Sequence, residues 1–79
     1  MSDKEVIVYS SSTCPPCKAV REFLSHHNVA FDEKMVDQDA AALEAFKQTG
    51  SRGTPTIMVG EEMIIGFDRG RLEQLLDLN

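Results

Sequence analysis

Two cysteines separated by two prolines, Cys14-Pro15-Pro16-Cys17, are the residues of this chain best suited to chemistry. They are its only cysteines, and a disulfide between them closes so short a loop that it adds little stability in the chain-entropy view. We therefore expect the pair to react rather than to support the fold. A C-x-x-C at a turn from a strand into a helix indicates thiol–disulfide exchange.

A predicted strand and a predicted helix flank the cysteines. Residues 6–9 (VIVY) are β-branched and aromatic, which is typical of a buried strand. Apolar residues then recur at helical spacing, which predicts a helix from about Pro15 to about His26 that stops near Asn28. The residues with this spacing are Val20, Phe23, Leu24 and His27.

The predicted helix start gives the two sulfurs different roles. Cys14 lies where unpaired N–H groups and the positive end of the helix dipole stabilise an anion, so we expect a lowered thiol pKa and a nucleophile. Because Pro15 and Pro16 have no N–H, the donors left for the thiolate are those of Cys17 and Lys18. Cys17 shares a helix face with apolar residues, so we expect it to be the buried thiol that resolves a mixed disulfide.

The rest of the chain predicts three more strands and two more helices, in the order βαβαββα. Residues 30–36 predict a weak strand, and Thr56–Val59 predict another. Residues 63–65 predict the last strand, after a turn at residues 60–62. This order predicts an α/β fold with a four-stranded mixed sheet and three flanking helices.

Acidic residues are expected to begin the two later helices. Asp37 or Asp39 is placed to cap the first of them, which ends before Gly50. Asp68 is placed to cap the second. The apolar residues that identify the two helices are Ala42, Leu43 and Phe46, followed by Leu72, Leu75 and Leu76.

Length and charge restrict the number of domains, the classes of partner and the location of the protein. Seventy-nine residues fit one domain, 1–79. The net charge of −5 argues against nucleic acid as a partner, because phosphate binding favours a basic surface. The charged residues 1–5 contain no apolar signal region, and no apolar run approaches the roughly 20 residues that span a bilayer. We expect a cytoplasmic monomer that does not associate with membranes.

A metal site is the main alternative use of the cysteines. His26 and His27 are the other zinc-type side chains, but His26 lies about 13 Å along the helix from Cys17 at 1.5 Å per residue. Adjacent histidines also differ from the H-x₃₋₅-H spacing typical of zinc sites. We expect no metal, although an iron–sulfur cluster shared between two chains stays open as a non-enzymatic alternative.

Three segments of the chain together resemble the glutaredoxin-like branch of the thioredoxin superfamily. They are Cys14–Cys17, residues 54–60 (TPTIMVG) and residues 64–68 (IIGFD), and the resemblance covers nearly the whole length. It implies a thioredoxin fold and a small redoxin that exchanges disulfides without a metal or organic cofactor. It also implies a cis peptide bond at Thr54-Pro55, with the Thr54 backbone open to a substrate strand and Pro55 beside the disulfide.

Several other residues are expected to support the site. Those next to the cysteines are Thr13, Pro15, Pro16 and Lys18. Those expected to contact glutathione or a partner are Arg52, Gly66, Phe67, Asp68 and Arg69.

Glutathione-dependent members of the family differ from this chain at several positions. They have a lysine in place of Ser11 and a tyrosine in place of Pro16. Their Gly-Gly-x-Asp-Asp loop corresponds to residues 65–69 (IGFDR), in which only Gly66 and Asp68 match. The sequence here is closer to the small redoxins that are reduced by thioredoxin reductase and supply ribonucleotide reductase. We therefore expect protein disulfides as substrates and a flavoprotein reductase of that type as electron donor, with glutathione as the alternative donor.

One further expectation concerns positive charge near the cysteines. The predicted fold brings Lys18, Arg52 and Arg69 to one end of the sheet, where they would form a basic rim on an otherwise acidic protein. Such a rim is expected to stabilise the thiolate and to steer an acidic partner or a thiol that carries a carboxylate.

Overall fold

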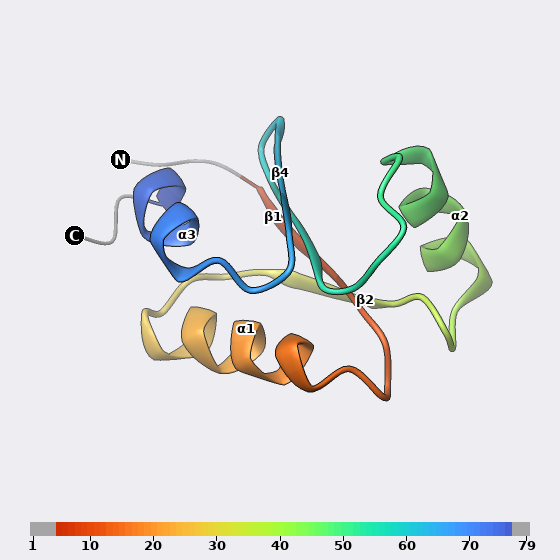
Figure 1. Cartoon of the computed structure of the whole chain (residues 1–79), viewed down its shortest axis with the longest axis horizontal. Helices are drawn as coiled ribbons and strands as arrows, with labels where there is room; N and C mark the ends of the chain where they lie inside the picture. The colour runs from red at the N-terminus through yellow and green to blue at the C-terminus, as the bar shows by residue number, and fades with distance from the viewer. Residues whose placement is uncertain (1–4, 77–79) are drawn as a thin grey trace.

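The computed structural model describes residues 5–76. Seven elements follow in the predicted order βαβαββα (Figure 1). None of the three helices in this part of the chain has the length and apolar character needed to cross a membrane. The elements are β1 (Val6–Ser10), α1 (Pro15–His26), β2 (Asp32–Met35), α2 (Ala40–Gln48), β3 (Thr56–Val59), β4 (Glu62–Ile65) and α3 (Arg69–Leu76).

The four strands form one mixed sheet, as predicted, and the structure gives their order as β2-β1-β3-β4. β1 and β2 are parallel because α1 connects the end of one to the start of the other, whereas β3 runs antiparallel to both β1 and β4. Val8 of β1 is aligned with Ile57 of β3, and Ile57 is aligned with Ile64 of β4. The C-terminal end of β1 therefore leads to the cysteines at one end of the sheet.

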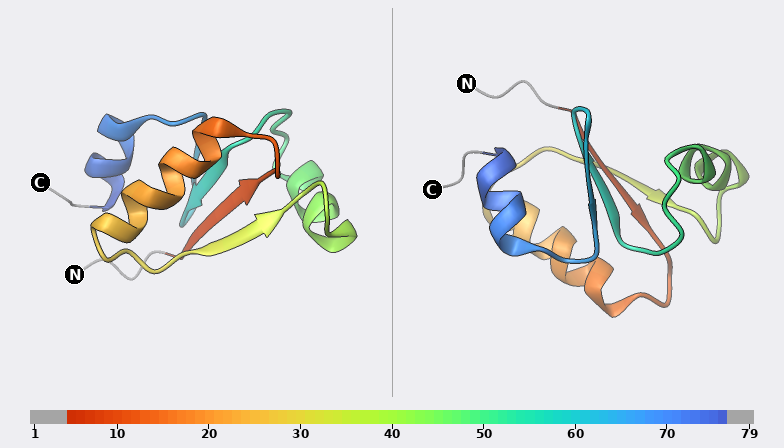
Figure 2. Two further views of the ribbon diagram at one scale, coloured as in Figure 1. Left: turned by 90° about the horizontal axis from the view of Figure 1, so that it is seen from below. Right: turned by 45° about the horizontal axis from the view of Figure 1, so that its top comes forward.

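The main core lies between the sheet and the pair of helices α1 and α3, which cover the same face (Figures 1 and 2). Val20 and Leu24 of α1 are fully buried there. The other face receives α2, whose Phe46 ring lies 5.7 Å from the ring of Tyr9. The remaining buried members of the main core are Val6, Val8, Ile57, Val59, Ile64, Leu72 and Leu76.

The helix ends follow the sequence signals closely. Asn28 adopts the left-handed conformation (φ 58°) just after α1, and Gly50 does so (φ 82°) after α2. Of the two acidic residues proposed as the cap of α2, Asp39 is the one that accepts hydrogen bonds from the first-turn N–H groups. Asp68 caps α3, accepting a hydrogen bond from the N–H of Arg71 at 3.1 Å.

Candidate functional site

The two cysteines form a disulfide at the start of α1. Cys14 is the N-cap residue, and Pro15 and Pro16 occupy the first two helical positions. The Cα atoms of Cys14 and Cys17 are 5.3 Å apart, and the N–H of Cys17 donates to the carbonyl of Cys14 at 3.1 Å. The prolines thus place Cys17 one turn along the helix, within bonding reach of Cys14.

The two sulfurs differ in their exposure to solvent. Cys17 is only 2% exposed, and it lies on the face of α1 that carries Val20 and Leu24 into the core. Cys14 is partly exposed at the mouth of the helix. Of the two sulfurs, that of Cys14 is therefore the more accessible to another molecule.

Two side-chain contacts hold the loop that precedes Cys14. The hydroxyl groups of Ser11 and Thr54 are hydrogen-bonded at 3.4 Å. The carboxylate of Asp37, just after β2, accepts hydrogen bonds from the backbone N–H of Ser12 at 3.0 Å and from its hydroxyl. These bonds, led by the one from the hydroxyl, hold the pKa of Asp37 below its usual value. The cysteine loop is thus tied to the segments on either side of it.

The segment before β3 contains the expected cis peptide bond between Thr54 and Pro55. Pro55 is fully buried, and its carbonyl accepts a hydrogen bond from the N–H of Gly66 at 2.8 Å. Within residues 5–76, no hydrogen bond engages the backbone N–H or carbonyl of Thr54. These backbone groups are available to an added strand, which would lie close to the Ser11 end of the cysteine loop.

The residues after β4 lie between the cis-proline segment and α1. Phe67 is 40% exposed and packs edge-on against Phe23, with 5.8 Å between ring centroids. Asp68 uses its carboxylate as the cap of α3. Arg69 pairs with Glu73 at 3.3 Å, and its guanidinium lies 6.0 Å from the centre of the Phe23 ring. The Asp68 carboxylate is thus used within the chain, and Arg69 makes one exposed ion pair through its Nε.

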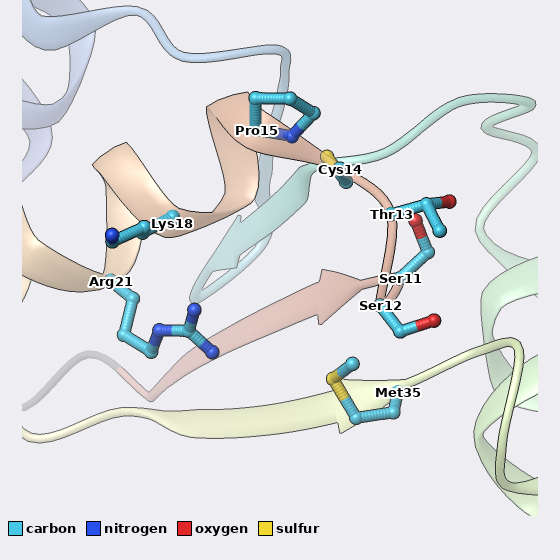
Figure 3. Close-up of a pocket in the computed structure, with 8 residues that line it drawn as sticks. All are labelled: Ser11, Ser12, Thr13, Cys14, Pro15, Lys18, Arg21 and Met35. Carbon is cyan, nitrogen blue, oxygen red and sulfur yellow. The ribbon is translucent and has the colours of Figure 1, made fainter.

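A pocket of about 390 Å³ opens beside Cys14, between α1 and the end of β2 (Figure 3). The cationic side chains in its lining are Lys18 and Arg21. Of the expected basic rim, the lining thus includes Lys18 but neither Arg52 nor Arg69. Arg52 is exposed and makes no ion pair within residues 5–76. The complete lining is Ser11, Ser12, Thr13, Cys14, Pro15, Lys18, Arg21 and Met35.

Sequence reasoning missed two members of this lining that the sequence could have indicated. Arg21 follows Lys18 by three residues, and residues three apart share a helix face. Met35 lies near the end of the second predicted strand, residues 30–36, and is the last residue of β2. Because β2 is parallel to β1, its end lies beside the end of β1. Helical spacing and strand direction together would have placed both next to Cys14.

The two histidines lie at the far end of α1 from the cysteines. The His27 ring packs 4.6 Å from the Phe23 ring and 5.3 Å from the His26 ring, measured between centroids. Over the described range 5–76, no group of three or more histidine, cysteine or acidic side chains is arranged to hold a metal ion.

The chain is similar to known proteins over most of its length. A family model described as Glutaredoxin matches residues 6–64. The glutaredoxin-like protein NrdH of Lactococcus lactis subsp. lactis is 36% identical over 70 residues, covering 89% of this chain and 97% of the relative. Glutaredoxin 3 of Escherichia coli is 34% identical over 79 residues, covering 90% and 95%. Among solved structures, a mutant of the thioredoxin-like protein BC3987 matches with a TM-score of 0.88 at 41% identity, over 95% of this chain and 97% of that one.

Proposed function

This chain belongs to the glutaredoxin family, has its thioredoxin-like fold and is a thiol–disulfide oxidoreductase, and on that premise we propose that Cys14 is the nucleophile and Cys17 the resolving cysteine. The contrast in burial between the two sulfurs supports this assignment most directly: Cys14 is partly exposed at the helix N-terminus, and Cys17 is 2% exposed behind it. A thiolate at a helix N-terminus is stabilised by the helix dipole.

The reaction is a two-step exchange of one disulfide for another. The Cys14 thiolate attacks a sulfur of the substrate disulfide, a mixed disulfide forms, and the first substrate thiolate leaves and takes up a proton. Cys17 then loses its proton and attacks the Cys14 sulfur, which releases the second substrate thiol. The substrate gains two electrons and two protons, and the chain is left with the Cys14–Cys17 disulfide.

The substrate in this proposal is a protein that presents an extended segment. The Thr54 backbone, free of hydrogen bonds within the described part of the chain, provides the groups that pair with such a segment by β-augmentation. Ser11 joins Thr54 to the cysteine loop, so an added strand and the Cys14 sulfur would be held in a fixed relation. Glutaredoxin chemistry itself requires no prosthetic group.

For the electron donor, we propose a flavoprotein of the thioredoxin-reductase type in preference to glutathione. Ser11 stands where glutathione-dependent relatives have a cation, and its hydroxyl is used by Thr54. Asp68 is used as a helix cap, and Arg69 places a cation where those relatives have a carboxylate. A donor of this kind implies the cytoplasm, where thiols are kept reduced.

The test compares two donor systems on one sample of the oxidised protein. One reaction contains NADPH and thioredoxin reductase, the other contains NADPH, glutathione and glutathione reductase, and both use insulin disulfides as the acceptor. The proposal expects NADPH oxidation at least about tenfold faster with thioredoxin reductase, which corresponds to about 1.4 kcal/mol of transition-state discrimination. Equal rates, or faster turnover with glutathione, would refute the donor assignment. The Cys14→Ser variant provides the background rate.

A further inference from the structure

The pocket beside Cys14 contains positive charge that the exchange reaction does not need. Lys18 is exposed and makes no ion pair or hydrogen bond within residues 5–76. Arg21 contacts Glu33 through one guanidinium nitrogen, Nη1, at 2.9 and 3.1 Å from the two carboxylate oxygens. Its Nε and Nη2 groups have no partner in the same described range. Lys18 is therefore free to bind an anion, and Arg21 keeps two guanidinium nitrogens for a further contact beside its ion pair with Glu33.

The rest of the lining suits a side chain with a short apolar stem and a polar end. Figure 3 shows Met35 extending from β2 towards α1 and the Arg21 guanidinium extending from α1 towards the strands. Pro15 adds a second apolar surface at the mouth, next to the Cys14 sulfur. An aspartate or glutamate side chain combines an apolar stem with a carboxylate that both cations favour.

The opposite side of Cys14 also carries positive charge, at the exposed Arg52 near the Thr54-Pro55 segment and at Arg69. There, Arg69 is paired with Glu73, and the Asp68 carboxylate caps α3. The chain as a whole carries a net charge of −5, so the free cations beside Cys14 are a local exception. An acidic partner segment is therefore attracted to the surroundings of Cys14 and repelled by most of the remaining surface. The pocket is where two cationic side chains, Lys18 and Arg21, lie in one lining beside the Cys14 sulfur.

We propose that this pocket binds an aspartate or glutamate of the substrate protein that lies within a few residues of the cysteine attacked by Cys14. The inference rests on the proposed function, because Cys14 itself lines the pocket. Lys18 and Arg21 are four and seven residues along from Cys14 and line the same pocket. Successive Cα atoms of a substrate are about 3.8 Å apart, so an acidic residue within a few positions of the attacked cysteine would lie at this pocket. The pocket thus selects substrates whose reactive cysteine has an acidic neighbour.

The test uses two short peptide disulfides that differ only in one residue beside the cysteine, glutamate in one and glutamine in the other. We expect kcat/KM about three- to fivefold higher for the glutamate peptide at low ionic strength, since exposed ion pairs contribute factors of this size. Added salt should bring the ratio towards one. A ratio of one at low salt would overturn the proposal.

Variants of the chain test whether the difference in kcat/KM between the two peptides arises in the pocket. Lys18→Gln should bring the ratio of kcat/KM for the glutamate peptide to kcat/KM for the glutamine peptide close to one. Any change in the reactivity of Cys14 affects both peptides equally and leaves this ratio unchanged. Arg71→Gln is the matched control, because it removes the same charge from α3, where Arg71 pairs with Glu62 at the far end of the sheet. It should leave the ratio unchanged; an equal fall in both variants would show a general charge effect and contradict the pocket.

One further outcome distinguishes failure of this inference from failure of the proposed function. Another distinguishes a protein substrate from a small-molecule ligand. If Cys14 were not the nucleophile, the Cys14→Ser variant would still reduce both peptides, whereas failure of the pocket alone leaves the parent chain reducing both at equal rates and Cys14→Ser reducing neither. Glutathione disulfide, which carries its own carboxylates, is the third substrate. A loss of its reduction in Lys18→Gln as large as the loss with the glutamate peptide would contradict a pocket built for a protein segment.

Discussion

The Asp37 carboxylate accepts hydrogen bonds from both the backbone N–H and the hydroxyl of Ser12, which lies 25 residues earlier in the chain. This contact joins the segment after β2 to the loop that carries Cys14. On the other side of the same loop, Ser11 is hydrogen-bonded to Thr54 beside the cis-proline. The position of the nucleophile is thus set by side chains from two distant parts of the chain, in addition to the start of α1.

The Ser12–Asp37 contact predicts a change in acid sensitivity when Ser12 is replaced by alanine. The hydroxyl is the main reason that the pKa of Asp37 is lowered, so Ser12→Ala should raise this pKa towards its usual value. A lowered folded-state pKa stabilises the fold fully above the unfolded-state pKa of about 3.9, and this contribution is lost as pH falls through the folded-state value. Stability below about pH 4 should therefore depend less steeply on pH in the variant than in the parent chain.

NMR titration of the Asp37 carboxyl measures the pKa, and urea unfolding at several acidic pH values measures the stability. Asp37→Asn serves as the control, because it keeps an oxygen acceptor for Ser12 but cannot titrate. An unchanged Asp37 pKa in Ser12→Ala would mean that the hydroxyl bond is not the cause.

The role of Asp68 can be separated into helix capping and ligand binding. Asp68→Ala should lower the free energy of unfolding by about 0.5–2 kcal/mol, the usual cost of losing an N-cap. Asp68→Asn should retain most of that stability, because asparagine is an equally good cap. Both variants should keep the parent rate with thioredoxin reductase at temperatures where they are folded. A specific loss of rate in the stable Asp68→Asn variant would show that the carboxylate also binds a partner.

The α1 face that buries Cys17 also predicts a strong effect on stability. Leu24 is fully buried between the sheet and α3, so Leu24→Ala should cost about 2–5 kcal/mol of unfolding free energy. Leu43 on α2 is 36% exposed, and Leu43→Ala should cost well under half as much. Chemical denaturation of both variants in the reduced state measures the difference. Equal costs would contradict the placement of the core on the α1 and α3 face.

The donor assignment predicts a gain of function with glutathione. Ser11→Lys combined with Arg69→Asp restores the cation and the carboxylate that glutathione-dependent relatives have at these positions. Glutathione-dependent turnover should rise several-fold, and turnover with thioredoxin reductase should fall or stay constant. Ser11→Ala is the control, since it removes the hydrogen bond to Thr54 without adding charge. No gain in the double variant would show that other residues exclude glutathione.

Most of the fold was predictable because its signals are local. The run at residues 6–9 and the spacing of Val20 and Leu24 placed β1 and α1 to within a residue of their observed bounds. The bounds of β2, observed at Asp32–Met35, were harder to predict because its side chains are mostly polar. Such side chains are tolerated here because β2 lies at an edge of the sheet. The element order then restricted the topology to a mixed sheet.

The site was less predictable where it depends on contacts between distant segments. Sequence alone could not choose between Asp37 and Asp39 as the cap of α2, since both precede the helix. In the structure Asp39 caps the helix, and Asp37 is held by Ser12. The expected basic rim included Arg69, but an aromatic ring and an acidic residue one turn away hold that side chain instead. Pairwise contacts of this kind depend on side-chain directions that periodicity does not specify.

The measurement that tests the central claim most directly is mass spectrometry of the two single-cysteine variants after incubation with a peptide disulfide. In Cys17→Ser, the partly exposed Cys14 should attack but cannot be resolved, so a stable 1:1 mixed disulfide at Cys14 should accumulate. In Cys14→Ser, the buried Cys17 should form little or no adduct in the same time under native conditions, because its sulfur is shielded by the first turn of α1. Adduct formation at Cys17 that is as fast as at Cys14 would contradict the division of roles between the two sulfurs.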